Sequence, residues 1–386
     1  MDRALTDALA VDPEPRRVLI VAGEPSGDLH AAGLVRALRG LGPAEVRGIA
    51  GPRMRAEGVG AIVRQEALAV IGFSGILARL PALFAARDRV LAEARSFRPH
   101  AVVLVDYPGF NLRLGPLLHR AGARVFYYIG PQVWAWHPER AAEMARWVDR
   151  LAVVFPFEEP LFRDAGVNTT FVGHPLLDEL EPETDEATLR AEIGAAPDSP
   201  LVGLLPGSRA GELAKHGARM LEAARLVRAA HPGVVPVLAL AEGLALDRLP
   251  RAALAGVAVV RGRTRSVQAY ATCCAVASGT ATLETALFGT PLVVVYRVGR
   301  LNYAIARRLV SLTHIGLPNI VAGEEVAPEL VQDAFTPQAL ARHLSGWLAD
   351  PAARATSHAR LGVVRAKLGG PGASARTARA LWETMA

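Results

Sequence analysis

The strongest constraint on the fold is an alternation between short valine-rich apolar runs and segments with helical spacing. Four such runs lie in the first half of the chain: RVLIVAG (Arg17–Gly23), AVVLVDY (Ala101–Tyr107), RVFYYIG (Arg124–Gly130) and LAVVF (Leu151–Phe155). A second series follows between Leu201 and Arg297: LVGLLPGS, VPVLALA, VAVVRG, CAVASGT and PLVVVYR. Runs without polar alternation indicate strands buried on both faces, as in parallel sheets covered by helices. The pattern predicts an α/β protein in which a doubly wound architecture occurs twice.

The two series of strands are separated by a segment typical of a domain connection. Residues 174–200 read HPLLDELEPETDEATLRAEIGAAPDSP, which is acidic, contains proline and has no strand-like run. We place the boundary near residue 175, between domains at 16–175 and 176–350. Residues 1–15 mix acids and prolines before any apolar run and are predicted to be a flexible leader, unlike a secretory signal. Doubly wound domains bind ligands at the carboxyl ends of their strands, so we expect the site in post-strand loops facing a cleft between domains.

Composition narrows the class of protein. The 386 residues, 51% of them hydrophobic, are enough for two domains that each bury a core. The two cysteines, Cys273 and Cys274, are adjacent and therefore suit neither an unstrained disulfide nor a zinc site. The longest apolar stretch, 67–86, contains Arg79 and Pro81, which argues against a membrane-spanning helix.

The charge balance points to anionic ligands. Lys and Arg number 43 against 37 Asp and Glu, and most of the basic residues are Arg, which suits phosphates or lipid head groups. A genome rich in Arg and Ala codons would give the same excess. No dense basic run is interleaved with aromatic residues, so nucleic acid is not an expected partner.

The loop after the first run, AGEPSGDLHAAGLVRAL, is predicted to bind a ligand and open a helix. Gly23 and Gly27 permit a tight turn, but the loop lacks the GxGxxG pattern of dinucleotide-binding proteins. Glu24 would repel a pyrophosphate, and Glu24 and Asp28 are better suited to sugar hydroxyls. Alternatively, Ser26 and Asp28 only cap the helix.

Asp106 ends the run AVVLVDY, at the position where α/β enzymes place catalytic groups. Sugar transfer with inversion needs one carboxylate that takes a proton from the attacking hydroxyl while the nucleotide leaves from the opposite face. A partly desolvated Asp106 could do this. Asp106 could equally fix the turn at Tyr107 and Pro108.

In the second half, LLPGSRAGEL joins a strand to a helix through Gly207, Ser208 and Arg209. Backbone donors at a helix start bind phosphate oxygens, and an arginine adds a charge-assisted contact. This arrangement would stabilise a diphosphate leaving group. The alternative is a capped turn with Arg209 in solvent.

The segment SGTATLE repeats this device, with Ser278, Gly279 and Thr280 before a helix that carries Glu284. Glu284 could grip ribose hydroxyls, or it could be the acidic partner in a capping box. Farther on, LPNIVAGEEVAPELVQ contains an asparagine and a glutamine, which either recognise nucleobase or sugar edges or satisfy loop backbone. These two amides are Asn319 and Gln332.

One apolar segment could contact a membrane. The stretch IGFSGILARLPALFAARDRV has helical spacing with Arg79, Arg87 and Arg89 on its flanks, a combination found in peripheral membrane binding as well as in ordinary core helices. The candidate contact residues are Ile71, Phe73, Ile76, Leu77, Leu80, Leu83 and Phe84. Trp134 and Trp136 could line the cleft, although packing is the commoner role of tryptophan and is favoured here.

Seven motifs, taken together in order, give the chain a family resemblance. They are AGEPSGDLH, VDYPGFNL, PQVWAW, FVGHPLLD, LLPGSRAGEL, SGTATLE and LPNIVAGEEVAPELVQ. From Val18 to the end the sequence resembles the lipid-A-disaccharide synthase family. The resemblance implies an α/β GT-B fold, in which two Rossmann-like domains face a central cleft and C-terminal helices, here 351–386, cross back to the N-terminal domain.

The resemblance also implies a reaction and its participants. The 2,3-diacylglucosamine unit of UDP-2,3-diacylglucosamine would be transferred to the 6-hydroxyl of 2,3-diacylglucosamine 1-phosphate, giving a β-1,6 disaccharide and UDP. No cofactor and no metal are implied. The location would be cytoplasmic and peripheral to the inner membrane, with a homodimer left open. The N-terminal domain would face acceptor and membrane, and the C-terminal domain would bind the UDP-sugar.

Carried over by motif, Asp106 matches the general base, Glu24 a neighbouring acceptor-side group and Arg209 the diphosphate contact. Glu284, Asn319 and Gln332 match the nucleotide-binding half. Some relatives have a second acid where this chain has Gly109, which argues that Asp106 acts alone.

Three alternatives remain at this stage. The first is another UDP-N-acetylglucosamine enzyme, either a peptidoglycan precursor transferase or a UDP-sugar 2-epimerase, which the order of the motifs disfavours. The second is a peripheral membrane protein without catalysis, which the presence of Asp106 and Arg209 disfavours. The third is an NAD-dependent oxidoreductase, which the missing dinucleotide fingerprint disfavours.

Overall fold

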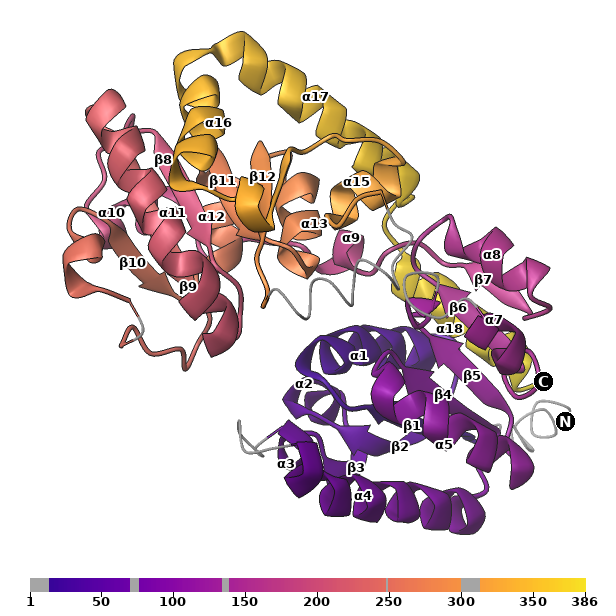
Figure 1. The fold of residues 1–386 in the computed structure, drawn as a ribbon. Helices are drawn as coiled ribbons and strands as arrows, with labels where there is room; N and C mark the ends of the chain where they lie inside the picture. The colour runs from indigo at the N-terminus through magenta and orange to yellow at the C-terminus, as the bar shows by residue number, and fades with distance from the viewer. Residues whose placement is uncertain (1–13, 70–75, 134–138, 248, 300–312) are drawn as a thin grey trace, which may run out of the picture. The chain divides into compact units, whose positions relative to one another are not determined.

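The computed structural model of the chain describes residues 14–69, 76–133, 139–247, 249–299 and 313–386. The chain divides into two compact units (Figure 1). The first consists of Met1–Pro175 together with Pro371–Ala386, and the second of Leu176–Gly370. Each unit is built on its own parallel sheet, so the alternation in the sequence corresponds to two separate α/β layers.

The first unit contains a seven-stranded sheet in the order β3-β2-β1-β4-β5-β6-β7. The strands are β1 (Arg16–Ala22), β2 (Ala44–Ala50), β3 (Gly60–Arg64), β4 (Ala101–Val105), β5 (Val125–Tyr128), β6 (Arg150–Val153) and β7 (Thr169–Phe171). The helices are α1 (Pro25–Arg39), α2 (Pro52–Ala56), α3 (Glu66–Ala69), α4 (Ile76–Phe97), α5 (Pro108–Arg120), α7 (Glu139–Met144), α8 (Glu158–Asp164) and α18 (Ala373–Thr384). Helices α1 and α18 pack together, as do α4 and α5.

The second unit contains a six-stranded parallel sheet in the order β10-β9-β8-β11-β12-β13. The strands are β8 (Leu201–Leu205), β9 (Val235–Leu240), β10 (Ala258–Arg261), β11 (Cys273–Ala277), β12 (Leu292–Tyr296) and β13 (Glu329–Val331). The α-helices are α9 (Leu176–Glu179), α10 (Glu186–Ile193), α11 (Ala210–Ala230), α12 (Thr264–Tyr270), α13 (Thr280–Leu287), α15 (Leu317–Ala322), α16 (Pro337–Ala349) and α17 (Pro351–Lys367), and the short 3-10 helices are η1 (Arg251–Leu254) and η2 (Gln332–Ala334).

In both sheets the central strands are valine-rich and fully covered. Every residue of β4 and of β8 is buried, because helices pack on both faces of these strands. Cys273 and Cys274 lie in β11 as buried thiols, and burial raises the pKa of Cys273 to about 12. The runs that lacked polar alternation are therefore the interior strands.

Strand order reverses at one point in each sheet, and this positions the candidate loops. In the first unit β1 lies beside β4, with Ala22 opposite Val105. In the second unit β8 lies beside β11, with Leu205 opposite Val276. Loops after such neighbouring strands diverge toward opposite faces of the sheet and leave a crevice where α/β proteins bind ligands. The loops that carry Glu24, Asp106, Arg209 and Ser278 all follow these four strands.

The C-terminal residues differ from the expectation for 351–386. Helix α18 belongs to the first unit, where Arg16 donates a hydrogen bond to the Met385 carbonyl at 2.7 Å and Arg124 to the Thr384 carbonyl at 2.8 Å. Helix α17, in contrast, packs on α13 and α15 and belongs to the second unit. The two helices separate where Gly369 and Gly372 adopt positive φ angles of 83° and 97°. Only the part after that turn returns to the first unit.

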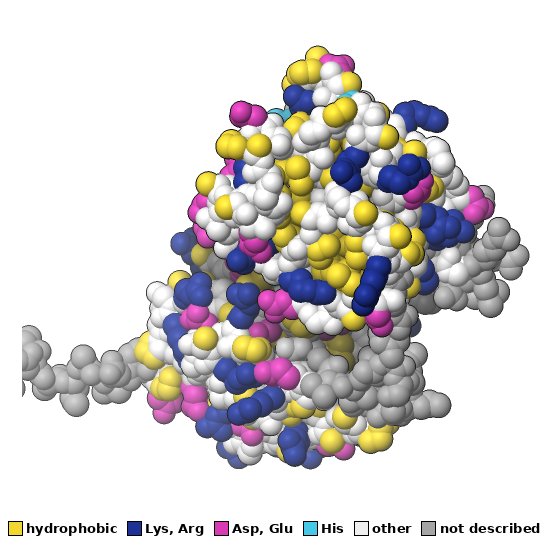
Figure 2. Space-filling model, turned by 90° about the vertical axis from the view of Figure 1, so that its left-hand side faces the viewer, with side chains coloured by type: hydrophobic (Ala, Val, Ile, Leu, Met, Phe, Trp, Pro, Cys, Tyr) yellow, Lys and Arg dark blue, Asp and Glu magenta, His cyan; other side chains and the backbone are white. Residues whose placement is uncertain are grey.

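The arginine excess is dispersed over the surface. Figure 2 shows Lys and Arg side chains scattered among Asp and Glu side chains and apolar areas on one face of the protein. Several arginines pair with carboxylates, including Arg55 with Glu66 at 2.7 Å and Arg225 with Glu222 at 2.7 Å. Within the described ranges, no helix combines the length and the apolar character that crossing a bilayer demands.

Candidate functional site

Asp106 directly follows β4, and its backbone is held in an unusual conformation. Asp106 and Tyr107 have φ angles of 46° and 49°, in the left-handed region that costs roughly 1–2 kcal/mol for a residue with a side chain. The Asp106 N–H donates to the Tyr128 carbonyl at 2.9 Å, while its own carbonyl accepts from Asn111 Nδ2 at 2.7 Å and from the Tyr127 hydroxyl at 2.8 Å. Three hydrogen bonds therefore fix the backbone of Asp106, the residue that the sequence analysis proposed as the base.

The surroundings of Asp106 shift its acidity toward neutral pH. Burial and, to a smaller extent, the nearby charge of Glu24 raise the pKa of Asp106 to about 6. A hydrogen bond from the Tyr107 backbone and the proximity of His30 act in the opposite direction. A general base works best when its pKa is near the working pH, so this carboxylate is suited to proton abstraction.

The Glu24 loop lies against the Asp106 loop. Because Ala22 is opposite Val105, Gly23 lies next to Asp106 across the two strands. A Cβ on Gly23 would be 2.3 Å from Cδ1 of the Tyr107 ring, so only glycine allows this approach. Glu24 is exposed just before α1, and Ser26 is exposed in the first turn of that helix. The structure thus brings Glu24 to the same edge as Asp106.

Asp28 has a structural role that the sequence only partly predicted. Its buried carboxylate accepts hydrogen bonds from the backbone N–H groups of Gly51 at 2.8 Å, Arg53 at 2.9 Å and Met54 at 3.2 Å. These groups form the start of α2, so Asp28 caps a different helix from its own. Its oxygens are engaged there, and the interpretation of Asp28 as a ligand for sugar hydroxyls is replaced by this role.

Two buried histidines near this edge were not predicted from the sequence. The rings of His30, in α1, and His174 are perpendicular, with centroids 6.4 Å apart. Burial, together with the proximity of His30, lowers the pKa of His174 to about 3, so His174 is neutral. The signal was present in the motifs AGEPSGDLH and FVGHPLLD, but only the fold brings the two side chains together.

In the second unit, the loop after β8 opens α11. Gly207 has a φ angle of 109°, and a Cβ there would lie 2.2 Å from an oxygen of Glu212. Glu212 accepts from the Arg209 backbone N–H at 3.2 Å and from Arg209 Nη1 at 3.0 Å. Ser208 is exposed, and the Arg209 side chain is 75% exposed. Arg209 can therefore reach a ligand, although an anion would compete with Glu212 for it.

His216 holds this loop through two hydrogen bonds to the backbone, and the sequence analysis did not predict its role. Its Nδ1 donates to the Pro206 carbonyl at 2.9 Å, and its Nε2 accepts from the Arg297 N–H at 3.1 Å. The second contact places the proton on Nδ1. Burial lowers the pKa of His216, so the ring is neutral and fixes the loop by hydrogen bonds rather than by charge.

The loop after β11 opens α13. Gly279 has a φ angle of 151° and, like Thr280, is exposed, while Ser278 donates to the Ile315 carbonyl at 2.9 Å. Glu284 forms an ion pair with Arg265 at 3.3 Å. No side chain caps α13, so Glu284 is not the capping-box partner that was considered.

Asn319 is buried in a network of four hydrogen bonds. Its Nδ2 donates to the Ala327 carbonyl at 2.7 Å and to Glu329 at 2.8 Å, and its Oδ1 accepts from the N–H groups of Val326 and Ala327 at 2.8 and 2.9 Å. All four side-chain positions are used, so Asn319 satisfies loop backbone and has no free group for a nucleotide. Gln332 lies farther along with a φ angle of 54°, and its Oε1 accepts from a backbone N–H at 3.3 Å.

Comparison with known proteins identifies the family. A family model described as lipid-A-disaccharide synthetase matches residues 18–377. The chain belongs to this family. Lipid-A-disaccharide synthase of Geobacter metallireducens is 43% identical over 374 residues, covering 96% of this chain and 97% of that protein. The synthase of Syntrophus aciditrophicus is 43% identical over 366 residues, covering 94% and 96%. The resemblance drawn from the seven motifs is confirmed.

Solved structures confirm the GT-B fold of this lipid-A-disaccharide synthetase family member. UDP-GlcNAc 2-epimerase from Neisseria meningitidis, bound to UDP-GlcNAc, superposes with a TM-score of 0.66 at 11% identity, covering 95% of this chain and 100% of that one. The calicheamicin glycosyltransferase CalG4 gives a TM-score of 0.59 at 17% identity, covering 96% and 98%. At such identities the likeness concerns the fold alone.

The structure describes only part of the apolar segment, residues 71–84, that was expected to contact a membrane. Ile71, Phe73, Trp134 and Trp136 lie outside the described residues, as do the side chains of Ile76 and Leu77. Leu80 is partly buried, and Leu83 packs against the core of the first unit. Phe84 is 49% exposed, with the Arg87 guanidinium 4.9 Å from the centre of its ring. Leu83 thus contributes to the edge of the core, and among the candidate side chains that the structure describes, Phe84 is the exposed one.

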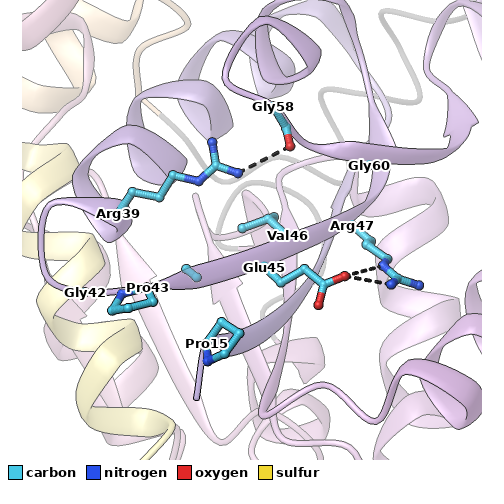
Figure 3. Close-up of a pocket in the computed structure, with 10 residues that line it drawn as sticks. Pro15, Arg39, Gly42, Pro43, Glu45, Val46, Arg47, Gly58 and Gly60 are labelled. Carbon is cyan, nitrogen blue, oxygen red and sulfur yellow. Dashed lines mark hydrogen bonds and ion pairs between the residues drawn. The ribbon is translucent and has the colours of Figure 1, made fainter. Parts of the chain in front are cut away.

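The first unit has a surface hollow of about 560 Å³ (Figure 3). It is lined by residues at the amino ends of β1, β2 and β3, whereas Asp106 follows the carboxyl end of β4. Arg39 donates to the Gly58 carbonyl at 3.3 Å, and Arg47 pairs with Glu45 at 2.6 Å. The charged groups of the hollow are already engaged. Among the described residues of the whole chain, no three His, Cys, Asp or Glu side chains are grouped to hold a metal ion.

Proposed function

We propose that the chain catalyses the inverting transfer of 2,3-diacylglucosamine from UDP-2,3-diacylglucosamine to the 6-hydroxyl of 2,3-diacylglucosamine 1-phosphate. The observation that carries this proposal is the partly buried carboxylate of Asp106, with a pKa raised to about 6, in a chain whose family is lipid-A-disaccharide synthetase. A carboxylate so tuned accepts a proton at neutral pH and is ionised before substrate arrives.

The first step of the mechanism is deprotonation of the acceptor. Asp106 takes the proton of the 6-hydroxyl as the oxygen of that group attacks the anomeric carbon of the donor sugar. The bond from that carbon to the UDP oxygen breaks on the opposite face, so the configuration inverts and a β linkage forms. Asp106 then passes its proton to water. We assign Glu24, which is exposed before α1, to accept a hydrogen bond from the acceptor sugar.

The leaving group is stabilised by the second unit. Backbone N–H groups at a helix start attract negative charge, which favours binding of the diphosphate at the start of α11, around Gly207 and Ser208, and at the start of α13, around Gly279 and Thr280. The exposed guanidinium of Arg209 adds a charge-assisted hydrogen bond as the diphosphate departs. We assign Ser278 and Glu284 to the nucleotide side of this site; the filled hydrogen bonds of Asn319 assign it to support of the loop.

The first unit is proposed to meet the cytoplasmic face of the inner membrane through the exposed end of the apolar segment. Phe84 with Arg87 combines an apolar ring with a cation, which favours the interface of an anionic bilayer. In flotation with vesicles containing anionic lipid, a smaller fraction of the Phe84→Ser variant than of the wild-type protein should float with the vesicles. Leu41, 41% exposed elsewhere in the same unit, provides the control Leu41→Ser. Equal loss in both variants would contradict the assignment of this surface.

The reaction is tested by incubating purified protein with both acylated substrates and without added metal. UDP release and the mass of the disaccharide are followed together. Equal amounts of UDP and disaccharide support the proposal, and UDP-N-acetylglucosamine offered in place of the acylated donor should give no disaccharide. UDP without disaccharide would indicate hydrolysis or another acceptor. The absence of both products would contradict the proposed activity.

A further inference from the structure

Two side chains outside the substrate loops hold the backbone of Asp106. Asn111 lies in α5, and its Nδ2 donates to the carbonyls of Asp106 at 2.7 Å and Val105 at 3.2 Å. Tyr127 lies in β5, and its hydroxyl donates to the same Asp106 carbonyl at 2.8 Å. Two donors from different elements therefore meet on one carbonyl oxygen, directly at the proposed base.

This carbonyl is where support is needed, because the conformation is unfavourable on its own. Asp106 and Tyr107 are consecutive residues with side chains in the left-handed region. Such strain persists only where the surrounding structure over-determines it, and it occurs frequently at active sites. The turn also sets the direction in which the carboxylate leaves the end of β4.

Both side chains remain hydrogen-bond donors under working conditions. Asn111 and Tyr127 are fully buried, so water does not compete for their hydrogen bonds. Burial and the neighbouring charge of Asp106 raise the pKa of Tyr127 well above its usual range, so its hydroxyl keeps its proton throughout the working pH range. Asn111 Oδ1 has no hydrogen-bond partner among the described residues, whereas Nδ2 has two acceptors, so the amide is oriented for donation to the turn.

We propose that Asn111 and Tyr127 are positioning residues, which fix the left-handed turn and thereby aim the Asp106 carboxylate at the acceptor hydroxyl. The inference rests on the proposed function, in which Asp106 is the base. Neither side chain touches substrate in this account. Both act through the Asp106 carbonyl.

The test uses two isosteric variants of the full-length protein. Tyr127→Phe removes one donor, and Asn111→Asp places a carboxylate against two carbonyls. Misplacing a catalytic group by about 1 Å costs roughly 100-fold, so kcat should fall by about 10- to 100-fold with little change in KM for the donor. The controls remove side-chain donors to other carbonyls. Thr169→Val removes a buried hydroxyl that donates to the Val167 carbonyl at 2.9 Å, and Asn168→Asp removes an exposed amide donor to the Asp149 carbonyl at 3.2 Å.

Two further readouts separate positioning from a loss of folding. In the Asp106→Asn background, Tyr127→Phe should cause no additional loss of kcat, because the group it aims is already gone. In the single variant, a loosened Asp106 becomes more hydrated and its pKa falls, so the acidic limb of the rate profile should move to lower pH. A fall in thermal stability alone would shift neither quantity.

Two results would overturn the inference. One is an unchanged kcat in Tyr127→Phe, and the other is the same fold decrease in kcat when Tyr127→Phe is added to the wild type and to Asp106→Asn. Should Asn111→Asp fail to fold, Tyr127→Phe still decides the question, since it removes only one oxygen. Failure of the proposed function is distinguishable, because it would show as absence of disaccharide with the wild-type protein.

Discussion

The two units present their candidate groups at equivalent edges but in opposite environments. The first unit places Asp106 in a partly buried, conformationally strained turn whose surroundings raise its pKa. The second unit places Arg209 at an exposed helix start, paired with Glu212. Both follow the central strands where the strand order reverses.

The difference follows from what each group has to do. A base gains from desolvation, because burial moves its pKa toward the working pH. A contact for a diphosphate must reach a ligand that arrives with its hydration shell, so it gains from exposure and from a long flexible side chain. The same α/β architecture thus provides a fixed carboxylate in one unit and an accessible cation in the other.

The largest effect is expected for Asp106→Asn. The variant should fold and bind UDP as the wild type does, but lose about 10²- to 10⁴-fold in kcat, the range expected for a missing general base. Turnover with saturating substrates and UDP affinity by calorimetry measure the two effects separately. Near-normal turnover would remove Asp106 from catalysis.

A smaller and broader loss is expected for Arg209→Ala. Removing a charge-assisted contact should lower both UDP affinity and kcat/KM by about 10- to 100-fold. Arg225→Ala is a matched control, since Arg225 is exposed in the same helix and pairs with Glu222 three residues away. Equal behaviour of the two variants would show that the loop around Arg209 has no special role.

Asp106→Asn should also stabilise the protein at neutral pH. Because the folded pKa of about 6 exceeds that of an unfolded aspartate, this carboxyl favours folding below about pH 4, and that contribution is lost as pH rises through 6. Removing the charge should therefore raise the free energy of unfolding by up to about 3 kcal/mol at pH 7.5. Denaturant unfolding at pH 7.5 and pH 4 would check this, and a variant less stable than the wild type at pH 7.5 would contradict it.

The smallest effect is expected for Glu24→Gln. The charge of Glu24 raises the pKa of Asp106, so its removal should lower that pKa and move the acidic limb of the rate profile to lower pH. The shift should be modest, because burial is the larger cause. The profile of kcat against pH measures it, and a limb that moves to higher pH would show that the two carboxylates do not interact in this way.

The sequence predicted the elements that depend on local pattern. Valine-rich runs without alternation became the buried central strands, because apolar periodicity reports burial directly. The resemblance of the motifs identified the family. In contrast, the assignment of 351–386 to one domain differed from the structure, since the helices α17 and α18 separate at residues 369–372. These residues read GGPG, a turn signal that the sequence analysis did not use.

The site residues show a similar limit. Asp28 was considered as a cap for its own helix, but it caps α2, whose first N–H partner is 23 residues away. His216 meets the backbone of Arg297, 81 residues away, and the two donors on the Asp106 carbonyl come from α5 and β5. Such contacts depend on which strands become neighbours, and a single sequence does not record that order.

The most direct test of the account is the rate profile of wild type and Asp106→Asn from pH 5 to 8.5, with both acylated substrates saturating. Wild-type kcat should rise with pH through about 6, as Asp106 loses its proton, whereas the variant should be slow with no such rise. A variant that keeps the same rise near pH 6 would contradict the role of Asp106 as the base, because the titrating base would then be another group.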